Sequence, residues 1–430
     1  MLRLSELLSH FGNNVKVRFS VDFLMTTSLM MILPYLPIYF SHKVGASLTG
    51  FMFAIVIICG ITGGVTGGML ADRIGRRKVM LISESVTIVM YTLIALCNSP
   101  WADKPYLTFL FFAIGMIFSG MINPAVSALL IDSSEPEYRK LMYQIQYWLI
   151  NVAVAIGSLI GGLFFQHYYF ILFSSVVVAN VIGFLSTVFF ITDEYKVPNK
   201  NEGTDQVLND QVNSGLLKNL SNLIKDRLFL LFFLAAFSIA TVSNQMVNYI
   251  AIHMSHTIPR QNVLGDIRLD GVNLLGILQS ENALLVIVLT FFVTYFVRKM
   301  NSRFVVIFGT ILFASGYVYM MLGNTPWLFI LAMFITTIGE LLYVPIEQNF
   351  LADLAPEDKR GLYIGIGGLN GSFGMIAASL MITVSQFLSP MIMAMVVGFM
   401  GLLAAILFGK IDARIKEKIK LQSKSADVKM

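Results

Sequence analysis

The chain has 430 residues, of which 56% are hydrophobic and 13% are charged. A soluble protein carries roughly twice that share of charged residues, so the excess apolar surface is expected to face lipid. The net charge of +5 is small, and no nucleotide-binding loop or catalytic constellation accompanies it. The composition therefore argues against a soluble enzyme, nucleic-acid binding, a cofactor and a bound metal.

The apolar residues are grouped into runs that are each long enough to cross a bilayer. A helix needs about 20 mainly apolar residues to span the hydrocarbon core. Twelve such runs predict an all-α membrane protein; they are residues 17–40, 47–70, 78–97, 105–132, 142–166, 168–191, 227–252, 274–297, 303–322, 326–352, 361–388 and 390–411.

A polar segment divides these runs into two sets of six. Residues 1–191 form the predicted N-terminal half and residues 227–411 the C-terminal half. A cytoplasmic linker is expected over residues 192–226, and a basic cytoplasmic tail over residues 412–430.

The distribution of basic residues predicts the orientation in the membrane. With the N-terminus inside, four of the 30 Lys and Arg residues fall outside: Lys43, Lys104, Arg260 and Arg268. Cytoplasmic loops carry the excess of Lys and Arg. We therefore expect a multi-pass cell-membrane protein with both termini in the cytoplasm.

The loop between the second and third runs is the most distinctive part of the chain. Residues 67–78 read GGMLADRIGRRK, with an acid and a glycine among four basic residues. Basic residues gather in many cytoplasmic loops and set topology there. That interpretation explains the cations but leaves Asp72 and Gly75 unexplained.

The two halves share a spaced set of residues. Pro124, Asp132 and Arg139 recur at one fixed offset as Pro345, Asp353 and Arg360. In both copies the proline falls inside a predicted helix and the aspartate at its inner end. This pattern predicts two parallel six-helix repeats, which place a substrate site between them near the bilayer midplane.

Several carboxylates fall inside predicted helices, where an ionised acid is costly. Glu340 lies near mid-membrane, and we find no Lys or Arg at its depth to neutralise it. An acid that is protonated in an apolar environment and ionised when water reaches it can carry protons. Glu340 is therefore the first candidate for proton coupling. Glu281 and Glu347 are the next candidates.

The alternative for Glu340 is a protonated side chain that bonds a backbone carbonyl. Glu84 is a weaker candidate, and Asp22 follows Arg18 by four residues as its local partner.

Four segments together resemble the drug/proton antiporters of the major facilitator superfamily. They are residues 67–78, residues 130–140 with Asp132 and Arg139, the run Tyr147-Trp148-Leu149-Ile150-Asn151, and residues 338–345 around Glu340. The resemblance covers residues 15–411 and implies a major facilitator fold of twelve transmembrane helices in two six-helix halves.

The resemblance also implies roles for individual residues. Glu340 would be a carboxylate for substrate and protons, with Gln146 and Asn151 nearby. The family's inner gate would correspond to Asp72, Arg73, Gly75, Arg76, Arg77, Asp132, Arg139, Asp353 and Arg360. Gln146 stands where a member of the family has a carboxylate, and Val247 where it has another, so proton stoichiometry is open.

The predicted function is proton-coupled efflux of lipophilic neutral or cationic compounds by a monomer in the lipid bilayer. Two alternatives stay open. One is a carrier for a single metabolite or lipid, with or without proton coupling; the other is a non-transporting membrane sensor or anchor.

Overall fold

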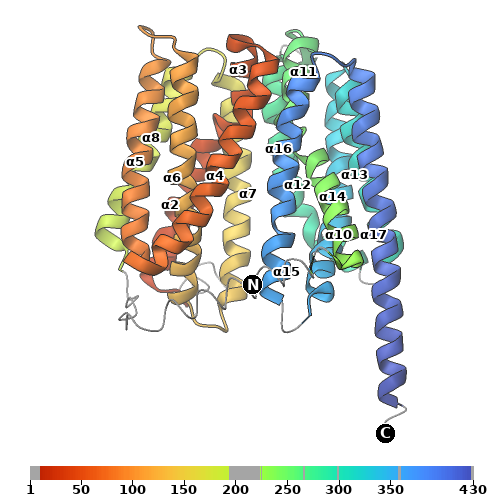
Figure 1. The fold of residues 1–430 in the computed structure, drawn as a ribbon. Helices are drawn as coiled ribbons and strands as arrows, with labels where there is room; N and C mark the ends of the chain where they lie inside the picture. Colours follow the sequence, from red (N-terminus) through yellow and green to blue (C-terminus); the bar gives the residue numbers. More distant parts are fainter. Residues whose placement is uncertain are drawn as a thin grey trace.

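The computed structural model describes residues 10–192, 223, 225–264, 267–297, 300–356 and 360–427. Most of the expected linker, and the side chain of Arg360, lie outside these described residues. The described chain is a bundle of long helices in two groups, coloured red to yellow-green and green to blue in Figure 1.

The N-terminal group contains seven α-helices and one short 3-10 helix. In chain order they are α2 (Asn13–Met30), η1 (Leu33–Tyr35), α3 (Leu36–Val44), α4 (Ala46–Ile74), α5 (Arg76–Cys97), α6 (Pro105–Asp132), α7 (Arg139–Phe164) and α8 (Tyr169–Phe190). Helices α2 and α3 together make one candidate membrane span, Asn13–Val44.

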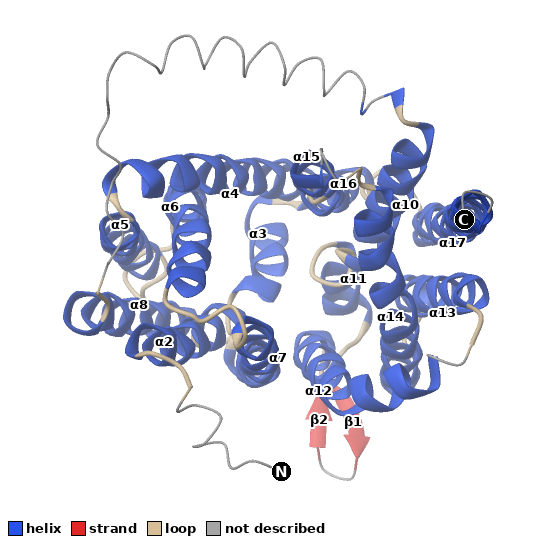
Figure 2. Ribbon diagram, turned by 90° about the horizontal axis from the view of Figure 1, so that it is seen from below, coloured by secondary structure: helices blue, strands red, loops and turns tan. Residues whose placement is uncertain are grey.

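The C-terminal group begins after the linker. Its elements are α10 (Arg227–Ser243), α11 (Tyr249–Thr257), β1 (Gln261–Leu264), β2 (Ile267–Leu269), α12 (Gly271–Val297), α13 (Ser302–Leu322), α14 (Pro326–Leu354), α15 (Arg360–Gly367), α16 (Leu369–Val384) and α17 (Pro390–Asp427). Strands β1 and β2 form an antiparallel hairpin, visible at the edge of the bundle in Figure 2.

Among the described residues, 11 helical segments are long and apolar enough to cross a membrane, and Arg227–Ser243 is a shorter apolar helix. The twelve predicted runs are thus confirmed as an all-α membrane fold. We call the end of the bundle where α2 begins and α17 ends the terminal face, and the opposite end, which carries β1 and β2, the hairpin face.

Four segments differ from the sequence prediction. The first run is divided into α2, η1 and α3. The seventh run is broken between α10 and α11, where the Asn248 side chain donates to the Asn244 carbonyl at 2.6 Å. The eleventh run is divided between α15 and α16 at Gly368. The last helix continues past the predicted span, which ended at residue 411, to Asp427. The charged residues of this part can form a helix in water just as the apolar residues before them form one in lipid.

Close helix packing within the N-terminal half depends on glycine. A Cβ at Gly63 would lie 1.9 Å from the Ile117 carbonyl oxygen, and one at Gly67 would lie 2.4 Å from the Met121 Cα. Small residues let two membrane helices approach backbone to backbone, where van der Waals contact replaces the missing hydrophobic drive. Helices α4 and α6 therefore pack backbone to backbone at these positions.

The two halves meet near the hairpin face. Asn273 of α12 donates to the Gly162 carbonyl at 2.7 Å, and Ser280 donates to the Ala155 carbonyl at 2.6 Å. Thr383 of α16 donates to the Ser47 carbonyl of α4 at 2.7 Å. At the ends of α3 and α11 on the hairpin face, the ring centroids of His42 and His256 lie 5.1 Å apart.

Packing is looser toward the terminal face. A Cβ at Gly365 of α15 or at Gly371 of α16 would meet nothing within 4 Å. The hydrogen bonds that the structure describes between the halves thus lie toward the hairpin face, which we take as the closed face.

Gly50 tests this closure, because a Cβ there would lie 2.3 Å from the Thr383 Oγ1 and 2.6 Å from the Ser379 carbonyl. We predict that Gly50→Ala opens the hairpin face and raises thiol labelling of cysteines placed there several-fold. The matched control is Gly64→Ala in the same helix, where the nearest atom is 3.9 Å away. Equal labelling of the two variants would contradict the assignment of the closed face.

Candidate functional site

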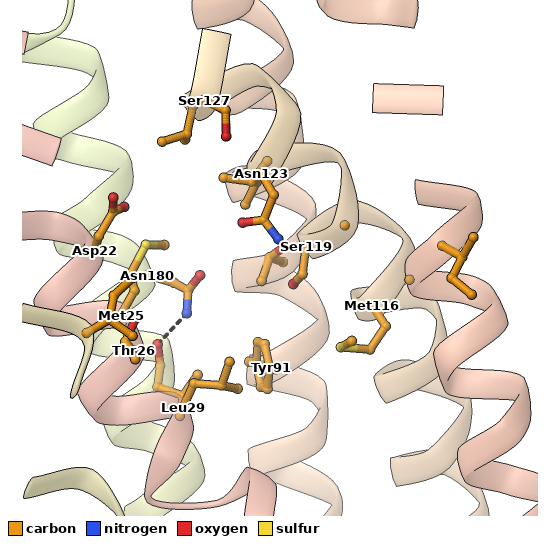
Figure 3. Close-up of a pocket in the computed structure, with 18 of the residues that line it drawn as sticks. Asp22, Met25, Thr26, Leu29, Tyr91, Met116, Ser119, Asn123, Ser127 and Asn180 are labelled. Carbon is orange, nitrogen blue, oxygen red and sulfur yellow. Dashed lines mark hydrogen bonds between the residues drawn. The ribbon is translucent and has the colours of Figure 1, made fainter. Parts of the chain in front are cut away.

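A cavity of about 540 Å³ opens among the helices of the N-terminal half. It runs from the level of Leu29 and Tyr91 toward the terminal face at Arg18 and Ser127. The side chains in Figure 3 come from several helices: Asp22, Met25, Thr26 and Leu29 from α2, Tyr91 from α5, Met116, Ser119, Asn123 and Ser127 from α6, and Asn180 from α8. Ser372 and Met375 of α16 add a wall from the other half.

The lining combines methionine and aliphatic side chains with neutral polar groups. Thioether and aliphatic groups adapt to irregular apolar ligands, while hydroxyl and amide groups fix orientation. Asn180, for example, donates to the Val176 carbonyl at 2.8 Å, which holds the amide against the cavity wall (Figure 3).

A charged cluster forms one side of this cavity. Arg18 pairs with Asp22 on its own helix and, at 3.3 Å, with Glu84 of α5. Thr187 of α8 donates to the same Glu84 oxygen at 3.1 Å. Gln146 of α7 reaches Asp22 at 3.5 Å. Side chains of α2, α5, α7 and α8 thus meet around three charged groups, which are Arg18, Asp22 and Glu84.

This cluster gives Glu84, one of the acids inside the predicted helices, a basic partner that the sequence did not indicate. Arg18 and Glu84 have 2% and 0% of their side chains exposed, and Asp22 has 17%. Asp22 is a local partner of Arg18 as predicted, but Arg18 also crosses to Glu84. Sequence spacing shows the i, i+4 pair and cannot show the contact between helices.

Glu340 is the middle residue of α14 and is partly buried. Asn282 of α12 donates to the Glu340 carboxylate at 2.9 Å and to the Thr337 hydroxyl at 3.0 Å. Among the described residues no Lys or Arg forms an ion pair with Glu340, so an amide is its hydrogen-bonding partner.

Three tyrosines lie within electrostatic range of Glu340. They are Tyr147 of α7, Tyr317 of α13 and Tyr343 of α14. Tyr147 belongs to the opposite half and is exposed. Glu340 therefore faces the interface between the halves, which is where the resemblance places a substrate carboxylate.

The remaining predicted carboxylates lie on the same two helices of the C-terminal half. Glu281 of α12 has an oxygen that is buried without a hydrogen-bond partner among the described residues. Glu347 lies two turns from Glu340 on α14, and both are close to Tyr343. Asn151 instead donates to its own helix, to the Tyr147 carbonyl at 2.8 Å.

The loop after α4 turns at Gly75, which has φ 93° and ψ 151°. This region of backbone conformation is essentially restricted to glycine. Across the turn, Arg76 pairs with Asp132 at the end of α6. Arg77 donates to the Val188 carbonyl at 2.6 Å, near the end of α8.

The structure thus brings Arg76 and Asp132 together but leaves Asp72 and Arg73 exposed. In the described part of the chain Asp72 takes part in no ion pair. Arg139 donates to the Ile131 carbonyl at 3.2 Å, and Asp353 is exposed near the end of α14. Pro345, Asp353 and Arg360 hold the same places in α14 and α15 as Pro124, Asp132 and Arg139 hold in α6 and α7.

The comparison with family models decides the family. The model of the Major Facilitator Superfamily matches residues 19–266 and 267–428. The chain belongs to the major facilitator superfamily. It is a multi-pass membrane transporter, as the sequence predicted.

Relatives of known name are similar over most of the chain. A Na(+), Li(+), K(+)/H(+) antiporter of Planococcus maritimus is 29% identical over 88% of this chain and 91% of its own length. Multidrug resistance protein MdtH of Yersinia enterocolitica is 20% identical over 82% of each. A crystal structure of a peptide transporter in complex with sulfate superposes with a TM-score of 0.73 at 16% identity, covering 97% of this chain and 99% of that one. This last likeness shows the fold.

Gly75 gives a direct test of the turn between α4 and α5. A side chain there costs about 1–3 kcal/mol of backbone strain, so we predict that Gly75→Ala lowers the thermal unfolding midpoint in detergent by several degrees. Gly365→Ala is the control, because its added methyl group meets open space. Equal midpoints for the two variants would show that the turn is not strained.

Proposed function

We propose that this protein is a proton-coupled exporter of cations, with lipophilic organic cations as the first candidate substrates. The observation that carries the proposal is Glu340, a mid-helix carboxylate between the two halves whose partner is a neutral amide. Because Asn282 is neutral, Glu340 can bind or release a proton or a cation without breaking an ion pair within the protein.

The chemistry rests on competition for one group. A proton or a cation neutralises the Glu340 carboxylate, and in a poorly hydrated site either is strongly preferred to an empty charged group. Both cannot bind there together. Binding of one therefore releases the other, and alternation between two open states turns this competition into exchange.

The apolar lining supports organic cations as cargo. Aromatic and thioether side chains attract cations through their electron-rich faces and sulfur atoms. Tyr147 and Tyr317 are close to Glu340, and Met25 and Met116 line the cavity of the N-terminal half. A bulky cation in the cavity would contact these methionines beside Asp22, the carboxylate that lines it, whereas a cation at Glu340 would lie close to the tyrosines.

A second candidate function is exchange of Na⁺, Li⁺ or K⁺ for protons. It is favoured by the Planococcus relative, which is named as an antiporter of these ions and aligns over 88% of this chain. The same carboxylate competition would operate, with a metal ion in place of the organic cation.

We further propose that the terminal face is cytoplasmic and that the loop after α4 belongs to the gate on that side. The pair Arg76–Asp132 ties two helix ends within one half. Asp72, exposed in this open state, would gain its partner at the beginning of α15 when the face closes. A helix N-terminus attracts a negative charge.

Glu340→Gln should abolish proton-driven exchange, because the amide cannot release a proton, while Glu340→Asp should retain part of it. The assay uses proteoliposomes with an imposed pH gradient, into which ethidium, Na⁺, Li⁺ or K⁺ is added while a trapped pH dye is followed. Glu135→Gln, on an exposed loop, is the control variant. If Glu340→Gln exchanges ethidium or a metal ion at the wild-type rate, coupling resides in another carboxylate, with Glu281 and Glu347 the next candidates in this half.

Asp72→Asn should shift the population toward the state open at the terminal face, since it removes a contact made in the closed state. Cysteines placed on α15 should then react faster with a membrane-impermeant thiol reagent, by about threefold if the contact contributes about 0.6 kcal/mol. Glu137→Gln, an exposed acid at the same face, is the control. Unchanged reactivity would remove Asp72 from the gate.

A further inference from the structure

The charged cluster of the N-terminal half has an unbalanced composition. Arg18 contributes one positive charge, and Asp22 and Glu84 contribute two negative charges when both are ionised. Arg18 and Glu84 are shielded from solvent, with 2% and 0% of their side chains exposed. A net charge in such a place is unfavourable unless it is neutralised.

The hydrogen bonds around Glu84 are also incomplete. One carboxylate oxygen accepts from Arg18 and Thr187. The other is buried and has no partner among the described residues, as are the hydroxyls of Ser83 and Thr87 on the same helix. These three groups lie within about one turn of α5, so two hydroxyls without partners are on the same stretch of helix as the unpartnered oxygen.

The cavity gives this cluster a route to water. Arg18, Asp22, Thr87 and Gln146 line the cavity, and Asp22 retains 17% exposure. Its carboxylate is labelled at the cavity edge in Figure 3. Arg18 pairs with both carboxylates, so a proton on Asp22 is separated from Glu84 by the Arg18 guanidinium alone.

We propose that Arg18, Asp22 and Glu84 form a second proton-coupling site, which holds one exchangeable proton shared between the two carboxylates. Adding one proton makes the net charge of the cluster zero and turns one acceptor oxygen into a donor. Arg18 keeps the remaining carboxylate ionised and positions both acids. The site is separate from Glu340, which lies in the other half of the fold.

Other groups packed around the cluster are neutral, apart from Arg77. Helix α7 contributes Gln146, α8 contributes Thr187, and α6 contributes Asn123 and Ser127 to the same cavity. Arg77 donates to the Thr187 and Val188 carbonyls, so its charge is directed to the end of α8. Within the described residues, the exchangeable proton thus belongs to Asp22 and Glu84.

The inference goes beyond the proposed function and is tested first without transport. Infrared difference spectra of the purified protein, recorded between acidic and alkaline pH, report the carbonyl stretch of protonated carboxyl groups. We expect a band in the wild type that persists in Glu340→Gln and disappears in Asp22→Asn/Glu84→Gln. Persistence of every wild-type carboxyl band in that double variant would overturn the proposal.

The single variants keep the test valid if the double variant does not fold. Glu84→Gln keeps an acceptor for Arg18 and Thr187, and Asp22→Asn changes the partly exposed member alone. Melting curves select the variants that fold, and loss or shift of the same band in either one supports the site. An unaltered band in every folded variant overturns it.

A second arm measures stoichiometry in proteoliposomes, with ethidium and Na⁺ as probes. The pH gradient that just balances a known cation gradient gives the number of protons exchanged per cation. We expect this number to fall by one in Asp22→Asn, whereas Glu340→Gln abolishes exchange. An unchanged number in a folded, active Asp22→Asn variant overturns the second site. If neither probe is exchanged by the wild type, the proposed function fails, and the infrared result decides the proton site by itself.

Discussion

The hydrocarbon core has no water to satisfy polar groups, and most of this structure follows from that constraint. Every backbone hydrogen bond must be made inside the protein, so the spanning segments are helices. Helix pairs gain little from hydrophobic association in lipid, so they depend on close contact between small residues. The pair α4–α6 shows this in Gly63 and Gly67, whose missing side chains admit the opposite backbone.

The same constraint explains where charges are found. At the terminal face, Arg76, Arg77 and Asp132 sit at helix ends, where water and backbone carbonyls share their solvation. Inside the bundle, Glu84 and Glu340 are stabilised by different partners. Glu84 is held by an arginine and a threonine, whereas Glu340 is held by an asparagine. These two environments give the halves different electrostatic roles despite their repeated architecture.

The different environments of Glu84 and Glu340 in the two halves are relevant to how the halves move during transport. A repeat places Pro124 and Pro345 at matching positions of α6 and α14, and the halves contact each other near the hairpin face through hydrogen bonds from neutral side chains to backbone carbonyls. Neutral contacts of this kind break and form without separating charges. In the proposed function, movement between open states would then depend on the proposed gate residues and on the protonation of the buried acids.

The sequence by itself determined the fold, because twelve apolar runs, a basic loop pattern and a repeated Pro–Asp–Arg spacing are local or periodic signals. It also identified Glu340 as an unusual mid-helix acid and singled out Gly75, whose φ of 93° came from the structure. It missed the break between α10 and α11, since Asn244 and Asn248 end the helix through hydrogen bonds that composition does not reveal. Only the tertiary structure showed that Arg18 reaches Glu84 and that Asn282 holds Glu340. Those contacts join residues far apart in the chain, and their partners are chosen by how helices pack, which no spacing along one helix encodes.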